Sequence, residues 1–208
     1  MTVTDVNVVK SAIFERPDDA NKGTLGSLLC VCGSYGMAGA AVMSAKGALR
    51  TGIGLAKCAL PRSIYPIVAQ TIFESVYYPL SENADGRISK VNVPFLVSES
   101  CKSSATLVGC GLGVCDDTLK IVFSLIENST TPLVLDADAL NCVAKQPEIL
   151  LRKKAPIIIT PHPGEMSRLT GLATPLVNAE RERVAIDFAQ KYGVAEELGG
   201  HLLVGAEA

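Results

Sequence analysis

The stretch "TPHPGE" (160–165) contains one of only two histidines in a chain of 208 residues, and its residue types could support chemistry. Pro161 and Pro163 flank His162, and because each proline ring fixes its own φ, we expect the imidazole on a stiffened loop. Glu165 falls where a helix should begin, a position at which the helix dipole favours a carboxylate. The isoleucines before this loop predict a buried strand, so the histidine is expected to face a cleft at the strand's end and contact a ligand. A histidine with a purely structural role is the alternative.

Two glycine-rich stretches, "GSYGMAGA" (33–40) and "GCGLG" (109–113), also follow directly after apolar runs. Glycine lets backbone N–H groups approach a ligand closely, and the helix N-terminus predicted after the first stretch favours an anion. In the second stretch, Gly111 and Gly113 could present backbone to a flat substrate. The respective alternatives are close packing of an Ala/Gly helix on a sheet and a plain strand-to-helix turn.

Acidic residues mark a fourth stretch, "DADALN" (136–141), which begins at the end of another apolar run. A buried carboxylate without partners is costly, so Asp136 must find hydrogen-bond donors there. We expect Asp136 and Asn141 to contact a ligand or to brace the site. Asp138 is expected to cap the helix that follows.

These stretches need a scaffold that brings them together, and the chain predicts one by alternating apolar runs with helical patterns. Strands are expected within 27–33, 53–60, 105–113, 132–140 and 155–165, the last two turning into helices. Further helices are expected at 37–52, 116–128, 164–170 and 178–192. Strands that are apolar on both faces and alternate with helices predict a parallel sheet covered by helices on each side, an α/β fold. In such sheets ligands bind outside the carboxyl ends of the strands, where all four stretches fall.

The bulk composition fits a single domain over residues 1–208, since no repeat or linker divides the chain. Hydrophobic residues make up 48% of the sequence and charged residues 19%, enough for a core on both faces of a sheet. A net charge of −2 with scattered Lys and Arg argues against a nucleic-acid surface. The apolar runs are too short to span a bilayer, and the N-terminus lacks a secretory signal pattern, so no membrane partner is expected.

The seven cysteines, without export features, suggest the reducing cytosol. They form no Cys-x-x-Cys pair and match no zinc spacing, so no metal site is expected from them. Cys30 and Cys32 share one face of a predicted strand and are expected to be small core residues.

Taken in order, four segments resemble the ADP/ATP-dependent NAD(P)H-hydrate dehydratases, a family of the ribokinase-like superfold. They are "KGTLGSLLCVCGSYGMAGAAVMSAKGALRTGIGLAK" (22–57), "VGCGLG" (108–113), "PLVLDADALN" (132–141) and "IITPHPGEMSRLTG" (158–171). The resemblance extends from about residue 10 to about residue 193. It implies a ribokinase-like three-layer αβα domain with a mostly parallel central sheet.

The resemblance also implies an activity, in which hydrated NADH or NADPH (NADHX or NADPHX) is dehydrated to the usable cofactor. ADP or ATP would be the co-substrate, with Mg²⁺ beside the nucleotide. Family positions that contact the hydrate fall on Ala40, Gly113 and His162. Other matching motif positions are expected to shape the site: Gly111, Asp136, Asn141 and Glu165. A cytoplasmic homo-oligomer, often a tetramer, is implied as well.

Beyond Val194 the sequence departs from the family pattern. The tail "AEELGGHLLVGAEA" (195–208) has neither a Lys-Gly pair nor the Gly-Ser/Thr-Gly-Asp motif whose aspartate is the family's catalytic base, and His201 within it is expected to be incidental. Without this motif we identify no catalytic residue and expect a C-terminally incomplete fold. Because phosphoryl transfer depends on positioning and electrostatic stabilisation, we expect dehydration to be impaired. A non-catalytic protein that binds a nucleotide or metabolite is the alternative. A small-molecule kinase of the same superfold is less favoured, because "TPHPGE" and "DADALN" fit the dehydratases better.

Overall fold

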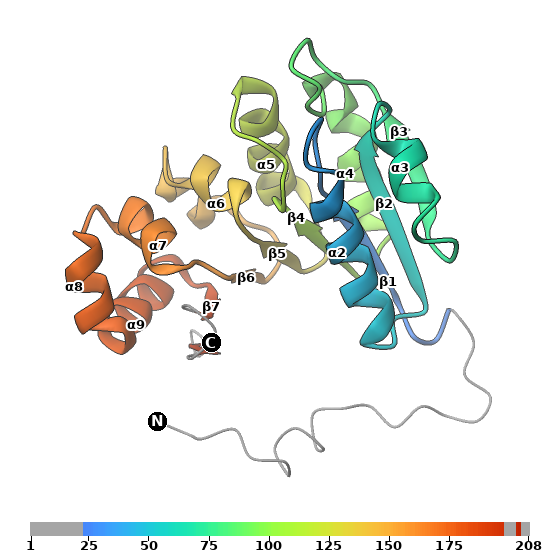
Figure 1. The fold of residues 1–208 in the computed structure, drawn as a ribbon. Helices are drawn as coiled ribbons and strands as arrows, with labels where there is room; N and C mark the ends of the chain where they lie inside the picture. The colour runs from blue at the N-terminus through green and yellow to red at the C-terminus, as the bar shows by residue number, and fades with distance from the viewer. Residues whose placement is uncertain (1–22, 198–202, 205–208) are drawn as a thin grey trace.

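The computed structural model describes residues 23–197 and 203–204, and within them eight strands form one sheet in the order β3-β2-β1-β4-β5-β6-β7-β8 (Figure 1). Every neighbouring pair is parallel except β7 and β8, which run antiparallel. The strands are β1 (Ser27–Val31), β2 (Leu55–Pro61), β3 (Val76–Leu80), β4 (Ala105–Val108), β5 (Leu133–Leu135), β6 (Ile157–Ile159), β7 (Ala195–Glu197) and β8 (Leu203–Val204). The predicted, mostly parallel sheet is confirmed.

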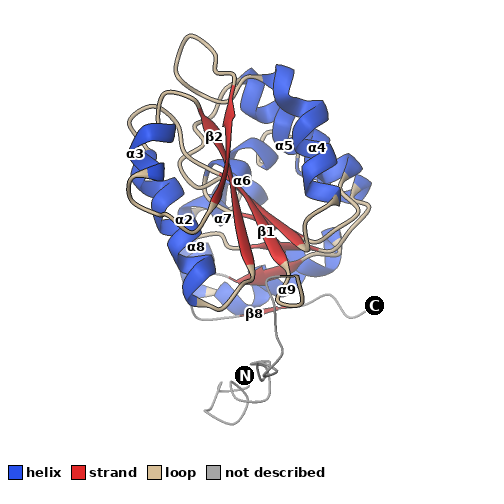
Figure 2. Cartoon of the chain, turned by 90° about the vertical axis from the view of Figure 1, so that its right-hand side faces the viewer, coloured by secondary structure: helices blue, strands red, loops and turns tan. Residues whose placement is uncertain are grey.

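Helices cover the sheet on both sides, as Figure 2 shows for α2 and α3 against α4 and α5. The helices are α2 (Ala38–Arg50), α3 (Tyr65–Ala69), α4 (Val93–Cys101), α5 (Asp116–Asn128), α6 (Asp138–Val143), α7 (Pro163–Thr170), α8 (Thr174–Ala179) and α9 (Arg181–Tyr192). Two short 3₁₀ helices, η1 (Lys90–Asn92) and η2 (Pro147–Arg152), precede α4 and β6. The three-layer α/β arrangement expected from the sequence is confirmed.

Strand β1 shows how the sheet divides the core into two. Leu29 and Val31 point to the side of α4 and α5, where the larger cluster of buried side chains lies. Cys30 and Cys32 point to the opposite side and pack in a smaller cluster with residues of α2 and α3. Both thiols are almost fully buried, which confirms the prediction that they are small core residues.

The α2–α3 layer does not extend over the whole of its face. Ile158 in the middle of β6 lies on this face and is 37% exposed, whereas its neighbours Ile157 and Ile159 are buried against the other layer. Val134 on β5, paired with Ile158, is half-buried. The two faces of the sheet are therefore unequally covered among the described residues.

Several elements differ from the sequence-based expectation. Strand β4 does not, since it ends at Val108 and the glycines that follow it form the loop expected there. The helix expected over 178–192 is divided at Glu180 into α8 and α9. The sequence also did not predict α3, β3 and α4; β3 "VYYPL" is a half-exposed edge strand interrupted by a proline, which weakens the usual strand pattern.

Two further expectations concern the C-terminal tail and membrane-spanning segments. Most of the divergent tail, including His201, lies outside the described residues. Among the residues that the structure does describe, no helix combines the length and the apolar character needed to cross a membrane.

The buried face of α5 yields a prediction about stability. Leu125 is fully buried in the larger cluster, so Leu125→Ala should lower the free energy of unfolding by about 2–5 kcal/mol through lost burial and a cavity. Leu151, which is 61% exposed, provides a matched control whose change to alanine should cost less than about 0.5 kcal/mol. Urea unfolding followed by circular dichroism measures both, and equal losses would contradict the core described here.

Candidate active site

The loops after β1 and β4 are held together by backbone and side-chain contacts. Gly33 N–H donates to the Cys110 carbonyl at 2.9 Å, and the Ser34 hydroxyl donates to the Gly111 carbonyl at 2.8 Å. Gly111 also lies against the start of α2, because a Cβ added there would come within 2.6 Å of the Ala40 Cβ. The structure thus brings Ala40 and Gly111 together, and a side chain at position 111 would displace one of the two loops.

The first glycine-rich stretch lines a hollow on the α3 side of this contact. Its volume is about 390 Å³, and its wall includes Tyr35, Gly36 and Gly39 together with Ile64 and Ile67 of the α3 region. Ile67 and Tyr35 are both largely exposed, at 56% and 74%. The stretch therefore packs on the sheet and also borders open space.

Asp136 follows β5 and finds the partners that a half-buried carboxylate needs. The Thr160 hydroxyl, at the end of β6, donates to one carboxylate oxygen at 2.8 Å. The Cys110 thiol, from the loop after β4, donates to the other at 3.1 Å. Asp136 thus ties three consecutive strand ends together.

The thiol of Cys110 belongs to a pair with Cys32. The hydrogen bond between them, together with burial, raises the pKa of Cys32 well above its usual value. Cys32 is therefore a neutral thiol in the core, and its role in the described residues is packing beneath the loops.

Asp138 does not cap α6 as expected. The N-cap is Ala137, the one non-glycine residue with positive φ (49°) in the described chain, and no side chain caps it. The Asp138 carboxylate instead reaches the neighbouring loop, where it accepts the Gly113 N–H at 2.8 Å, and it also accepts Asn141 Nδ2 at 3.3 Å. Asn141 Oδ1 in turn accepts Arg168 of α7 at 2.8 Å. The cap prediction is wrong because the Asp138 carboxylate binds the Gly113 N–H of the neighbouring loop and not a backbone N–H at the start of α6.

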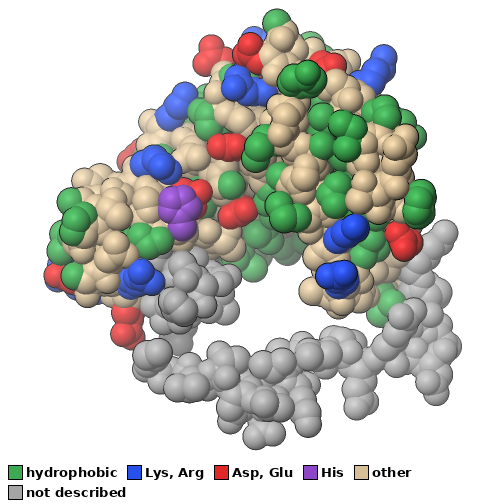
Figure 3. Space-filling view, viewed as in Figure 1, with side chains coloured by type: hydrophobic (Ala, Val, Ile, Leu, Met, Phe, Trp, Pro, Cys, Tyr) green, Lys and Arg blue, Asp and Glu red, His purple; other side chains and the backbone are tan. Residues whose placement is uncertain are grey.

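His162 occupies the N-cap of α7 and shares a capping box with Glu165. Its Nδ1 accepts the Gly164 N–H at 3.0 Å, while Glu165 Oε2 accepts the His162 N–H at 2.9 Å. An acceptor Nδ1 places the proton of the neutral ring on Nε2, 3.3 Å from Glu165 Oε1. Glu165 is buried, but the histidine side chain stays 60% exposed, and it is the purple group in Figure 3. The side chain thus starts the helix and keeps a surface open to solvent.

Gly113 is covered by a residue that the sequence did not point to. A Cβ added at Gly113 would collide with Arg87 Nε and lie 2.9 Å from Arg87 Cδ. Arg87 comes from the turn after β3, and no spacing in the sequence relates that turn to the loop after β4. Only the packing of these two loops in the folded chain brings Arg87 and Gly113 together.

The contacts link most, but not all, of the predicted residues. Ala40 meets Gly111, Asp136 joins the loops after β4 and β6, and Asp138 connects Gly113 with Asn141. His162 lies on the adjoining loop after β6, and within the described chain its hydrogen bonds stay inside α7.

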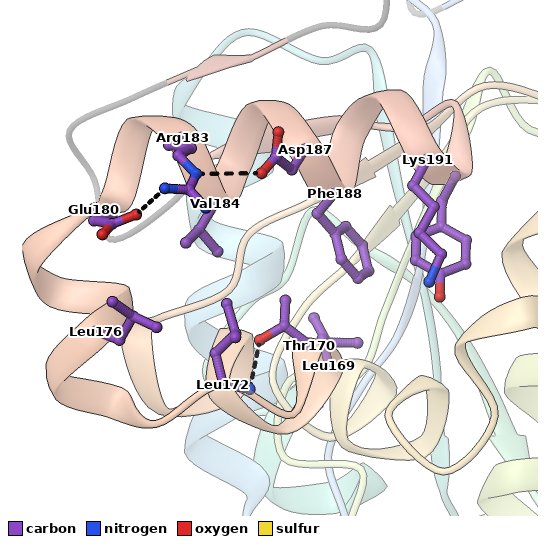
Figure 4. Close-up of a pocket in the computed structure, with 11 residues that line it drawn as sticks. Leu169, Thr170, Leu172, Leu176, Glu180, Arg183, Val184, Asp187, Phe188 and Lys191 are labelled. Carbon is purple, nitrogen blue, oxygen red and sulfur yellow. Dashed lines mark hydrogen bonds and ion pairs between the residues drawn. The ribbon is translucent and has the colours of Figure 1, made fainter.

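A separate cavity of about 270 Å³ lies between α7, α8 and α9 (Figure 4). Leu176 and Phe188 are among its apolar lining residues. At its rim, Arg183 pairs with Glu180 at 2.8 Å and with Asp187 at 3.7 Å. None of the residues singled out in the sequence lines this cavity, so we do not assign the candidate site to it.

In the described residues, no group of three or more His, Cys, Asp or Glu side chains is arranged to hold a metal ion. The small residues at the strand ends are instead packed closely against the loop after β5, the start of α2 and Arg87. Hydrogen-bonding side chains border this region on the loops after β5 and β6.

A parallel sheet between helical layers, with its polar and glycine-rich loops at the carboxyl ends of the strands, defines a ribokinase-like protein, and solved structures of that class share this fold. The chain belongs to the NAD(P)H-hydrate dehydratase family, since the model of that family (Carb_kinase) matches residues 28–201.

Individual relatives agree with this assignment. The bifunctional NAD(P)H-hydrate repair enzyme of Thermofilum pendens is 37% identical over 176 residues, covering 85% of this chain and 34% of the relative. The ADP-dependent (S)-NAD(P)H-hydrate dehydratase of Neisseria meningitidis is 31% identical over 189 residues, covering 89% and 60%. The Bacillus subtilis ADP/ATP-dependent NAD(P)H-hydrate dehydratase, co-crystallized with ATP/Mg²⁺, superposes with a TM-score of 0.77 at 27% identity, covering 96% and 67%. The chain spans about a third of the length of the bifunctional relatives.

The glycine after β4 yields a prediction that separates close approach from helix propensity. Gly109 has φ +127°, and an added Cβ would strike the Asp136 carbonyl and lie 2.8 Å from the Ala139 Cβ. Gly109→Ala should therefore lower the free energy of unfolding by more than about 2 kcal/mol. Gly47→Ala, in the middle of α2 with no described atom outside the helix within 4 Å, should raise it by about 0.5–1 kcal/mol. Urea unfolding of both variants measures the sign, and a tolerated Gly109→Ala would refute the close contact.

Proposed function

We propose that this chain serves nicotinamide-nucleotide repair, as part of an enzyme that dehydrates NAD(P)H hydrate to NAD(P)H with ADP or ATP. The observation that carries the proposal is the contact of Gly111 with Ala40, with Gly113 on the same loop and His162 on the loop after β6. The start of α2 and these two loops carry the three residues that the family resemblance assigns to the hydrate. Membership of the family, and the ADP-dependent activity named for the Neisseria relative, support it.

The reaction follows from the chemistry of the leaving group. Hydroxide leaves the hydrated nicotinamide ring poorly. The ring hydroxyl therefore first gives its proton to a base and takes a phosphoryl group from ADP or ATP, which leaves as AMP or ADP. The phosphate then departs with the C–O bonding electrons, the ring nitrogen lone pair drives this departure, and loss of a ring proton restores the reduced nicotinamide. The protein's part in such a transfer is to hold the reacting groups in place and to stabilise the charge that develops.

The proposed roles of the residues differ. Ala40, with only a methyl group, lets the substrate approach the start of α2, and Gly113 would meet it together with the Arg87 side chain that covers this glycine. In its proposed role the Nε2–H of His162 donates to the substrate instead of facing Glu165 Oε1 at 3.3 Å, while the capping box with Glu165 fixes the backbone of His162. Asp136 holds the strand ends together.

The remaining features of the proposal concern the surroundings of the site. Gly111, Asn141 and Glu165 shape it through the contacts described above. Mg²⁺ would accompany the nucleotide, and we assign it no ligand on this chain because no suitable cluster exists among the described residues. A single domain that assembles into a homo-oligomer, acting in the cytoplasm, is also proposed; its seven free cysteines fit a reducing compartment.

The experiment is an absorbance assay at the reduced-nicotinamide band. The chain is mixed with NADH hydrate or NADPH hydrate, Mg²⁺ and either ADP or ATP, and binding of the hydrate is measured in parallel by calorimetry. We expect His162→Ala to weaken hydrate binding about 10-fold, the effect of one lost hydrogen bond of about 1.4 kcal/mol. Arg152 is exposed and lies in η2, before β6 and therefore at the other end of the strands, so Arg152→Ala should bind as the wild type does.

The outcomes separate the two functions. A nucleotide-dependent rise in absorbance supports the dehydratase. Hydrate binding without any rise supports the non-catalytic binding protein instead. A folded wild-type chain that binds no hydrate overturns both.

A further inference from the structure

The turn formed by residues 82–88, here called the 82–88 turn, folds over the carboxyl ends of β1 and β4. Its two ends meet in an antiparallel bridge between Glu82 and Ile88. Ile88 is fully buried in the larger core cluster, and the Gly86 carbonyl accepts the Tyr35 N–H at 2.9 Å. The turn is therefore anchored both in the core and on the loop after β1.

Arg87 is held within this turn by Asn83. The Asn83 side-chain oxygen accepts the Arg87 N–H at 3.1 Å, and the Asn83 N–H donates to the Arg87 carbonyl at 2.9 Å. Asn83 Nδ2 donates in turn to Asp117 in the first turn of α5 at 3.1 Å. The backbone that carries Arg87 thus has little freedom, which is what precise recognition of a ligand requires.

The side chain of Arg87 extends across Gly113. With Arg87 in this position there is no room for a side chain at position 113, since an added Cβ would collide with Arg87 Nε and lie 2.9 Å from Arg87 Cδ. Arg87 is 31% exposed, so one part of the side chain covers the glycine while another part reaches solvent beside the candidate site.

The charge of Arg87 is only weakly compensated. Its NH1 donates to Asp85 at 3.2 Å, but Asp85 is 67% exposed, and such a pair contributes little in water. In the described chain no other acceptor lies within hydrogen-bond distance of the guanidinium. The nearby carboxylates have other partners: Asp117 binds Asn83 and lies 3.9 Å from Lys90, and Asp138 binds Gly113 and Asn141.

We propose that Arg87 binds the pyrophosphate of the dinucleotide substrate, an inference that rests on the proposed function. A guanidinium presents five N–H donors in a fork that matches phosphate oxygens, and most of them are free here. Gly113, which Arg87 covers, is one of the residues assigned to the hydrate. The pyrophosphate is the charged group closest to the nicotinamide riboside, and NADH and NADPH hydrates share it, whereas the 2′-phosphate of NADPH lies at the far end of the molecule.

Calorimetric titration tests this with the full chain and its variants Arg87→Gln, Arg87→Lys and Arg152→Gln. Arg152 is a matched control, because it too is an arginine in a surface ion pair, 3.1 Å from Glu127. It lies in η2, before β6 and therefore at the other end of the strands. The ligands are NADH hydrate, NADPH hydrate and the hydrate of dihydronicotinamide riboside, which lacks every phosphate. Thermal unfolding of each variant shows that it is folded.

We expect Arg87→Gln to weaken both dinucleotide hydrates by about 10- to 100-fold, the effect of removing a charge-assisted hydrogen-bond donor. Binding of the phosphate-free nucleoside should change by less than about twofold, and so should every titration of Arg152→Gln. Arg87→Lys should fall between wild type and Arg87→Gln, since an ammonium keeps the charge without the fork; it also carries the test if Arg87→Gln does not fold.

Three results would overturn the assignment to the pyrophosphate. They are unchanged dinucleotide binding in Arg87→Gln and Arg87→Lys, a loss confined to NADPH hydrate, and an equal loss for the phosphate-free nucleoside, which would make Arg87 a structural residue. In each of these cases the wild type still binds the hydrate, so the proposed function stands. A wild type that binds no hydrate would overturn the proposed function together with this inference.

Discussion

The loop after β4 runs between three neighbouring structures, and it can do so only where its residues lack side chains. At Gly109 the neighbour is the backbone of Asp136, at Gly111 it is the start of α2, and at Gly113 it is Arg87. Interiors are packed so closely that one added carbon must move backbone or α2 at Gly109 and Gly111, and the Arg87 side chain at Gly113. The positions of the loops after β1 and β5 relative to each other therefore depend on this one glycine-rich segment.

Polar contacts then fix what close packing has brought together. Asp136 accepts hydrogen bonds from the loops after β4 and β6, and Asp138 accepts the Gly113 N–H. Each acidic side chain thereby gains donors in a region where an unpaired charge would be costly. The same contacts give a ligand at the strand ends a surface with defined shape, which links the stability of the loops to the proposed binding of a nicotinamide nucleotide.

His162 and Arg87 border this surface from different elements and are positioned in similar ways. Each has its backbone tied by a nearby side chain, Glu165 for His162 and Asn83 for Arg87, while part of its own side chain faces solvent. A rigid backbone with an accessible polar tip reduces the entropy lost when a ligand binds. In the proposed function, the histidine would address the hydrated ring and the arginine the pyrophosphate.

The parallel α/β sheet and the four loops that carry the candidate residues could be predicted from the sequence, because alternating apolar runs and glycine or proline signals are local properties of the chain. The sequence also pointed to Asp136 as a residue that needs partners. The contact partners themselves follow from the tertiary structure. Asp136 binds Thr160 and Cys110, Asp138 binds Gly113, and Gly113 packs against Arg87. These contacts join residues about 20 or more positions apart, and they follow from strand register and loop packing, which no local pattern encodes.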